Sequence, residues 1–157
     1  MIYSDSSFIV SLVSSDFGTS AAQSTFRSLG RPRLFFSDLH EMEVRNALRA
    51  VQFIETTNSP AKRHPEILAQ RQRSEARLNH MLKVKALHRH SLSQESVIST
   101  FETLSADHTP ELGVRTLDIM HVANVLLLGC QEMITCDVRQ AALARAVGLK
   151  VRLVEFS

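Results

Sequence analysis

Two aspartates come directly after predicted buried strands. Asp5 follows the apolar run Ile2–Ser4, and Asp137 closely follows the apolar run Gln131–Thr135. Each is followed in turn by a predicted helix. Ligand sites in open α/β sheets form at the carboxyl ends of the strands, where helix N-termini favour negative charge. We therefore expect both carboxylates to face one crevice.

The other two candidate acids lie on predicted helices. Asp118 is in the first turn of an apolar helix that Thr116 can cap and Gly129 can end. Glu43 adjoins the apolar face of a helix that a capping-box pattern starts at Asp38. A lone carboxylate near a buried face costs several kcal/mol unless it is compensated. Glu43 is therefore expected to have a specific partner.

If the four acids meet, something must offset their mutual repulsion. At roughly 5 Å and an effective dielectric constant near 20, each carboxylate pair repels by about 3 kcal/mol. Oxygen ligands select a hard cation such as Mg²⁺ or Mn²⁺ over zinc. Such ions commonly bind substrate phosphates, which favours metal-assisted phosphodiester hydrolysis. We therefore predict that Asp5, Glu43, Asp118 and Asp137 are both catalytic and metal-binding.

Strands and helices that alternate along the chain must position these acids. The predicted strands lie at Ile2–Ser4, Leu34–Phe36, Gln131–Thr135 and Lys150–Val154. Between them we expect the helices Ser20–Leu29, Pro65–His90 and Ser93–Ala106, and loops at Ser14–Thr19 and Asp107–Gly113. This order predicts a three-layer α/β/α sandwich with a four- or five-stranded, mainly parallel sheet. The 157 residues are expected to form one domain, 1–157.

The charge of the chain is uneven. Its net charge is only +2, but residues 51–90 hold eight Lys/Arg against three Asp/Glu, and the remainder holds ten against thirteen. We expect a basic helical arm at about 56–90. Its cations could contact RNA phosphates, its face could simply be solvated, or its apolar stripe could dock a partner helix or a second copy. The candidate RNA-binding residues are Arg71, Arg73, Arg77, Lys83 and Lys85.

Several classes of protein do not fit the sequence. No signal peptide or membrane span is predicted, so we expect a cytoplasmic protein with no membrane contact. Cys130 and Cys136 do not form a zinc motif and are interpreted as small core residues. No nucleophile elbow, Walker loop or dinucleotide-binding fingerprint occurs. A receiver domain would need paired acids at the first strand end, and a haloacid-type phosphatase would need an acid at Ser7.

Four segments that contain the acids resemble one known family. They are Asp5-Ser-Ser-Phe-Ile-Val, Glu43-Val-Arg-Asn-Ala-Leu, Asp118-Ile-Met-His-Val-Ala, and Thr135-Cys-Asp with Gly148-Leu-Lys-Val. In order and spacing they resemble the PIN-domain family, and within it the VapC-type toxins. The resemblance covers nearly the whole chain. The departures from the family are a longer and more basic region at Thr56–His90 and a histidine three residues after Asp118.

The resemblance implies both a fold and an activity. It implies an α/β/α sandwich in which the four acids bind Mg²⁺ or Mn²⁺ and cleave single-stranded RNA. It also implies an antitoxin partner and a homodimer. Ser7 and Thr135 match positions that hold the acids or a water molecule in similar proteins, so they are expected to support the site.

Simpler interpretations remain open for each residue. Asp5 and Asp137 could only cap helices, and Asp118 could only stabilise a helix N-terminus. Glu43 could be paired with Arg45 or Arg115. His121 could approach the metal, although a histidine on an apolar helix is more often a hydrogen-bonded core residue. The alternative function is a non-catalytic PIN-fold module that binds RNA or protein.

Overall fold

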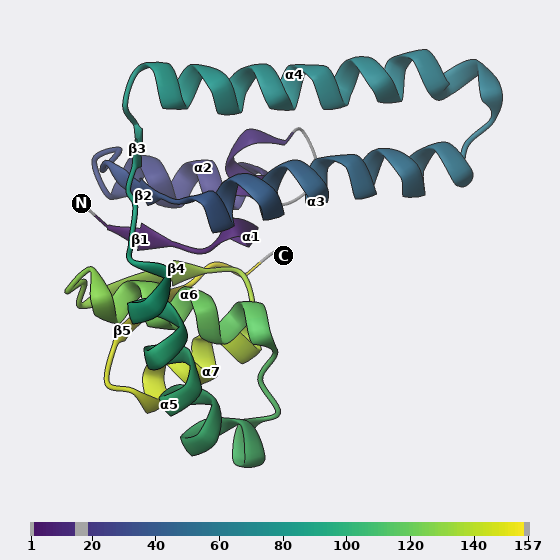
Figure 1. The fold of residues 1–157 in the computed structure, drawn as a ribbon. Helices are drawn as coiled ribbons and strands as arrows, with labels where there is room; N and C mark the ends of the chain where they lie inside the picture. Colours follow the sequence, from purple (N-terminus) through teal and green to yellow (C-terminus); the bar gives the residue numbers. More distant parts are fainter. Residues whose placement is uncertain (1, 15–18, 156–157) are drawn as a thin grey trace.

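The computed structural model describes residues 2–14 and 19–155. The chain forms five short strands and seven α-helices within these residues (Figure 1). The strands are β1 (Tyr3–Ser4), β2 (Leu34–Phe36), β3 (Leu87–Arg89), β4 (Glu132–Thr135) and β5 (Lys150–Leu153). The helices are α1 (Ser6–Val13), α2 (Thr19–Ser28), α3 (Asp38–Thr57), α4 (His64–Lys83), α5 (Gln94–Leu112), α6 (Thr116–Leu127) and α7 (Val138–Ala146), with a 3-10 turn at Ala61–Arg63. Most of the loop predicted at Ser14–Thr19 lies outside the described residues.

The strands pair in parallel. β4 lies between β1 and β5, and β2 pairs with β3. A parallel bridge between Ile2 and Leu34 joins the two groups, so the spatial order is β3, β2, β1, β4, β5. The connection direction changes at β1, because the chain first builds outward through β2 and β3 and then returns to β4. The carboxyl ends of β1 and β4 therefore lie side by side at this point, where α/β sheets usually bind ligands.

Alternate strand residues divide the core into two layers. Leu34, Phe36 and Ile134 pack with α1 to α4 on one face of the sheet. Phe35 and Met133 pack with α5, α6 and α7 on the other face. This alternation follows from the two-residue period of a strand. The predicted three-layer α/β/α sandwich is confirmed, and the two cysteines pack at the edges of these clusters.

Two helix starts differ from the prediction by one residue. Ser37, and not Asp38, is the N-cap of α3, and its backbone N–H donates to Nδ1 of His40 at 3.1 Å. Arg115, and not Thr116, is the N-cap of α6, because the carboxylate of Asp118 accepts the backbone N–H of Arg115 at 3.2 Å. In both cases the side chain at the third helical position reaches back to the cap and fixes the boundary.

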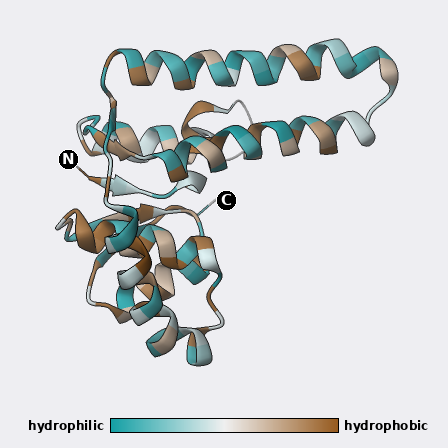
Figure 2. Cartoon of the chain, viewed as in Figure 1, coloured by the Kyte–Doolittle hydropathy of each residue, from teal (hydrophilic) through white to brown (hydrophobic). Residues whose placement is uncertain are grey.

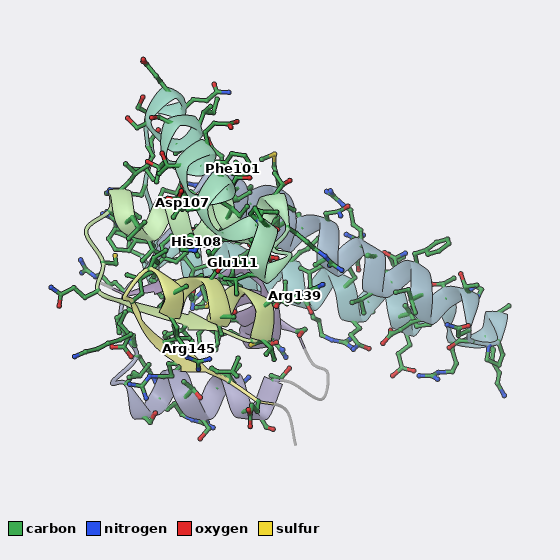
Figure 3. The ribbon with its side chains drawn as sticks, turned by 90° about the horizontal axis from the view of Figure 1, so that it is seen from below. Phe101, Asp107, His108, Glu111, Arg139 and Arg145 are labelled. Atoms are coloured by element: carbon green, nitrogen blue, oxygen red, sulfur yellow. The ribbon has the colours of Figure 1, made fainter. Side chains whose placement is uncertain are left out.

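The predictions for residues 84–113 are partly wrong. The expected helix Pro65–His90 ends at Lys83, and Leu87–Arg89 is the edge strand β3. Residues 87–89 form a strand and not a helix because Leu87 is buried in the core beside β2, where it is 1% exposed. The expected loop Asp107–Gly113 is mostly the last turns of α5, including Pro110, and Figure 3 shows Asp107 and His108 on that helix. The helix ends where Gly113 adopts a φ of +59°, which favours glycine.

The two longest helices form an arm. α3 and α4 run antiparallel, and their connected ends extend beyond the rest of the chain in Figure 1. We call α3, Ala61–Arg63 and α4 the helical hairpin. Figure 2 shows that hydrophilic residues predominate along α4, with hydrophobic bands at intervals. Leu78 is buried where α4 meets the body, whereas Phe53 near the far end of α3 is 71% exposed.

No helix within the described part of the chain combines the length and the apolar character needed to cross a bilayer.

Candidate active site

The four predicted acids lie around one pocket. It has a volume of about 400 Å³ and lies at the carboxyl ends of β1 and β4. Its lining includes Asp5 after β1, Glu43 on α3, Asp118 on α6 and Asp137 after β4. We call it the acid pocket. Residues 132 positions apart in the sequence thus meet because β1 and β4 are neighbouring parallel strands.

Asp5 is the most buried of the four acids. It is 3% exposed, and its Oδ1 caps α1 by accepting the Phe8 N–H at 2.9 Å. Its carboxylate also accepts hydrogen bonds from the hydroxyls of Ser7 and Thr135. Burial raises the pKa of Asp5, although His121 and these donors act in the opposite direction. The carboxylate is therefore held rigidly in a partly desolvated position.

Ser7 and Thr135 join this carboxylate to the end of β4. The hydroxyl of Ser7 donates to Asp5 and accepts the Cys136 N–H at 3.0 Å. The hydroxyl of Thr135 donates to Asp5 and accepts the Asp137 N–H at 2.9 Å. Their position agrees with a supporting role, and Thr135 ties two of the acids to each other.

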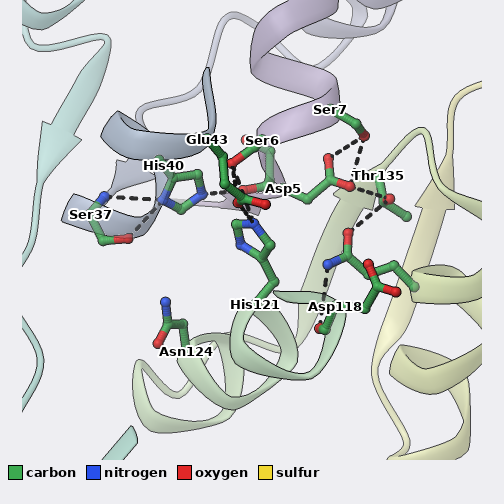
Figure 4. A network of polar contacts seen from close by, with 12 residues as sticks. Asp5, Ser6, Ser7, Ser37, His40, Glu43, Asp118, His121, Asn124 and Thr135 are labelled. Carbon is green, nitrogen blue, oxygen red and sulfur yellow. Dashed lines mark hydrogen bonds and ion pairs between the residues drawn. The ribbon is translucent and has the colours of Figure 1, made fainter. Parts of the chain in front are cut away.

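Glu43 pairs with a histidine. Its Oε2 lies 2.6 Å from Nε2 of His121 and accepts the Ser6 hydroxyl at 2.8 Å (Figure 4). Burial acts to raise the pKa of Glu43, but the hydrogen bonds and charge of His121, together with Ser6, outweigh it and lower the pKa. The alternative pairing of Glu43 with Arg45 or Arg115 is not found among the described residues, because Glu43 pairs with His121 and Arg45 pairs with Glu41.

Asp118 and Asp137 both line the pocket, and the charge of Asp137 acts on Asp118. Asp137 caps α7 by accepting the Arg139 and Gln140 N–H groups at 2.8 and 3.3 Å. Burial raises the pKa of Asp118, and the negative charge of Asp137 raises it further, against the Arg115 N–H and the positive charges of Arg139 and Arg115. These two carboxylates are close enough to interact, and a cation between them would relieve the repulsion.

The simpler capping interpretation is also correct for three of the acids. Asp5 and Asp137 cap α1 and α7, and Asp118 reaches back to the start of α6. A capping role does not exclude a second role, because each carboxylate has an oxygen beyond the one used in the cap.

Ser6, Gln140 and Arg115 also line the pocket, although the sequence did not single them out as site residues. Ser6 donates to Glu43, Gln140 is buried and donates to the Asp118 carbonyl at 3.4 Å, and Arg115 contributes a cation to the lining. Gln140 could have been found, because it stands three residues after the cap Asp137 and so faces back toward it. Ser6 carried no signal of its own among the serines at the first strand end.

The candidate RNA-binding residues divide into two groups. Arg71 pairs with Glu75 on the same helix, and Arg77 donates to the carbonyls of Val13 and Ser14. The remaining three residues are exposed: Arg73, Lys83 and Lys85. The contacts of Arg71 and Arg77 have a structural role, so Arg73, Lys83 and Lys85 are the better candidates for contact with a phosphate chain.

The donor chemistry of the acid pocket suits a hard divalent cation. Four carboxylates line it, which is the oxygen ligand type that Mg²⁺ and Mn²⁺ prefer. However, among the described residues no three His, Cys, Asp or Glu side chains are grouped closely enough to hold one ion. The expectation that the acids crowd together intolerably is therefore corrected, because protein hydrogen bonds satisfy each of them separately. Side chains would have to rotate to share a cation.

A family comparison agrees with this architecture. A model described as the PIN domain matches residues 2–146. The chain belongs to the PIN-domain family. PIN domains are generally nucleases, and they typically use divalent metal ions. No curated protein matches the sequence significantly.

Within this PIN domain, the matched region includes all four acids and both strands that bring Asp5 and Asp137 together. The family resemblance inferred from the four sequence motifs is thereby confirmed. Assignment to the VapC-type toxins is a narrower statement and stays a prediction.

Proposed function

We propose that this PIN domain is a Mg²⁺- or Mn²⁺-dependent endoribonuclease that hydrolyses phosphodiester bonds of RNA in the cytoplasm. The observation that carries the proposal is the convergence of Asp5, Glu43, Asp118 and Asp137 on one pocket from four separate parts of the chain. If the aspartates only capped helices, they would have no reason to share one pocket. The common pocket adds a place where an ion and a phosphate group can meet.

The residues of the chain would divide the work as follows. The four carboxylates hold the cation, and Ser7 and Thr135 keep Asp5 in place. When bound, the cation would polarise the scissile phosphate and offset its charge. Arg115 at the pocket wall and Arg139, whose guanidinium lies 4.0 Å from Asp137, offset the repulsion between the acids and an approaching RNA strand.

RNA digestion tests this proposal. The full chain is incubated with single-stranded RNA and Mn²⁺, with and without excess chelator, beside the variants Asp118→Asn and Asp107→Asn. Asp107 is an exposed acid of α5 outside the acid pocket and serves as the matched control (Figure 3). We expect cleavage by the wild type and Asp107→Asn only when Mn²⁺ is present. Equal cleavage by Asp118→Asn, or cleavage in chelator, would contradict the proposal.

We also propose that the protein is the toxin of a toxin–antitoxin pair and forms a homodimer, as the resemblance to VapC-type toxins implies. A second pocket of about 620 Å³ between α2 and α4 offers support for a protein partner. Its lining includes the half-buried Phe26 and Met81 and the exposed Arg27, Arg31 and His80, and it contains no acidic residue. An antitoxin segment with apolar and acidic side chains would match this groove. Growth arrest by the wild type but not by Asp118→Asn would support the toxin assignment.

A second candidate function is a non-catalytic PIN-fold module that binds RNA or protein. It is favoured by one observation, that hydrogen bonds within the protein already satisfy the acids and no group of three is assembled within the described residues. RNA retention that weakens with salt, with no cleavage products in Mn²⁺, would favour this alternative.

A further inference from the structure

A buried histidine is part of the lining of the acid pocket. His121 stands on α6, three residues after Asp118, and is 3% exposed. Its ring is enclosed by two other rings: Tyr3 at a centroid distance of 5.8 Å and His40 at 4.9 Å, both nearly edge-on. Burial lowers the pKa of His40 to about 3, so His40 packs against His121 as a neutral ring. Tyr3 and His40 also contact each other, with ring centroids 5.1 Å apart, so the position of His121 is fixed within a cluster of three rings.

The hydrogen-bond donors around His121 place a proton on its Nε2. Nδ1 lies 2.7 Å from the hydroxyl of Tyr3, which in turn accepts the Asn124 side-chain amide at 3.5 Å. Nε2 lies 2.6 Å from Oε2 of Glu43. A carboxylate oxygen has no proton to give, so a contact this short requires the hydrogen to be on Nε2. Burial raises the pKa of Tyr3 well above its ordinary value, which keeps the hydroxyl protonated and able to donate to Nδ1.

The two carboxylate oxygens of Glu43 differ in their hydrogen-bond contacts. Oε2 accepts both the His121 N–H and the Ser6 hydroxyl. No contact with a described donor is found for Oε1. The carboxylate is therefore anchored through one oxygen (Figure 4). The other oxygen remains available in a pocket that three aspartates also line.

We propose that His121 is a positioning residue for Glu43: it anchors Oε2, so that Oε1 is the oxygen available to a divalent cation in the acid pocket. The proposal rests on the proposed metal-dependent function. Tyr3 and Asn124 extend the anchor into the core, since they orient the ring whose other nitrogen holds Glu43. Residues that orient metal ligands in this way commonly change metal affinity by about 10- to 100-fold when they are replaced.

Calorimetric titration of the metal-free full chain with Mn²⁺ tests the proposal without any activity measurement. His121→Leu removes the N–H donor at similar volume, and His121→Gln restores an N–H donor near the same place. We expect Mn²⁺ affinity to fall about 10- to 100-fold in His121→Leu and to recover largely in His121→Gln. Tyr3→Phe, which frees the ring of its Nδ1 partner, should weaken binding several-fold.

The variant Val122→Ala is the control for an effect of reduced stability on Mn²⁺ affinity. Val122 is the fully buried neighbour of His121 on α6, and it packs in the core cluster rather than in the acid pocket. This variant should keep the wild-type Mn²⁺ affinity although it is less stable. If His121→Leu does not fold, the Tyr3→Phe and His121→Gln variants carry the test.

The outcomes separate this inference from the proposed function. Equal or tighter Mn²⁺ binding by His121→Leu would overturn the positioning role and leave the nuclease proposal standing. Wild-type protein that binds no Mn²⁺ would overturn both. A long-range ¹H–¹⁵N spectrum of the imidazole gives an independent readout: a protonated Nε2 is expected, and a bare Nε2 would overturn the inference directly.

Discussion

The acid pocket and the helical hairpin carry charge in opposite ways. In the acid pocket, each carboxylate accepts hydrogen bonds from donors at fixed positions, as when Thr135 of β4 and Ser7 of α1 fix Asp5. On the helical hairpin, exposed cations such as Arg73 and Lys83 lie on one long helix and need no fixed geometry to act. A catalytic site needs side chains at fixed positions, whereas attraction of a polyanion such as RNA needs only a high density of positive charge.

The largest difference between the two regions should be in cleavage rate. Asp5→Asn keeps an oxygen that can cap α1 but removes a negative ligand, and a bound metal contributes several kcal/mol of transition-state stabilisation. We therefore expect a rate loss of about 1,000-fold for Asp5→Asn. Arg73→Gln should lose less than about 10-fold, because one phosphate contact is a minor part of binding. Initial rates on one RNA at saturating Mn²⁺ measure both.

A rate loss for Arg73→Gln as large as that for Asp5→Asn would contradict the different roles assigned to the two regions. In that case, the helical hairpin would take part in the chemistry rather than in RNA attraction.

The next effect concerns how the helical hairpin is attached to the body. Leu78 is fully buried in the cluster that joins α4 to the sheet, so Leu78→Ala should cost about 2–5 kcal/mol of unfolding free energy. Phe53→Ala, 71% exposed near the far end of α3, should change it by less than about 0.5 kcal/mol. Urea denaturation followed by circular dichroism compares the two variants. Equal losses would mean that the far end of the hairpin is also packed against something.

The smallest effect is a pH-dependent gain in stability at the acid pocket. Burial and the charge of Asp137 raise the pKa of Asp118 from its ordinary value of 3.8. As pH rises from about 3.8 through the raised pKa, the unfolded chain releases this proton first, so the carboxyl group destabilises the folded state increasingly. Asp118→Asn should therefore melt like the wild type at low pH. At pH 7 without metal it should melt higher, by about 1–2 °C.

Scanning calorimetry at a series of pH values measures this difference. A lower melting temperature for Asp118→Asn at pH 7 would show that the carboxylate serves mainly to stabilise α6. A matched scan of Asp107→Asn on α5 should show no such pH-dependent gain.

Much of the fold could be predicted because the signals are local. The strand at Leu34–Phe36 and the acids after β1 and β4 follow from short apolar runs and the residue types that end them. Strand β3 could not be predicted, because Leu87–Arg89 continues a helical, basic pattern and only its burial beside β2 makes it a strand. The helical turns of α5 beyond Ala106 were missed because Pro110 suggested a break, although α5 continues through it to Leu112.

The candidate site divides in the same way. Three of the acids could be identified from their positions at strand ends and a helix start, and Glu43 from its place beside an apolar helix face. Asp5 and Asp137 meet because β1 lies beside β4. The partner of Glu43 could not be identified, because Glu43 and His121 are 78 residues apart and belong to helices on opposite faces of the sheet. Their contact is made beyond the carboxyl ends of the central strands β1 and β4, which no local pattern encodes.

The most direct measurement is the anomalous scattering of crystals soaked with Mn²⁺. We predict a peak in the acid pocket, with carboxylate oxygens of Glu43 and at least two of the three aspartates at about 2.1 Å. No peak in the acid pocket, at a Mn²⁺ concentration that supports RNA cleavage in solution, would contradict the assignment of these residues as the metal site.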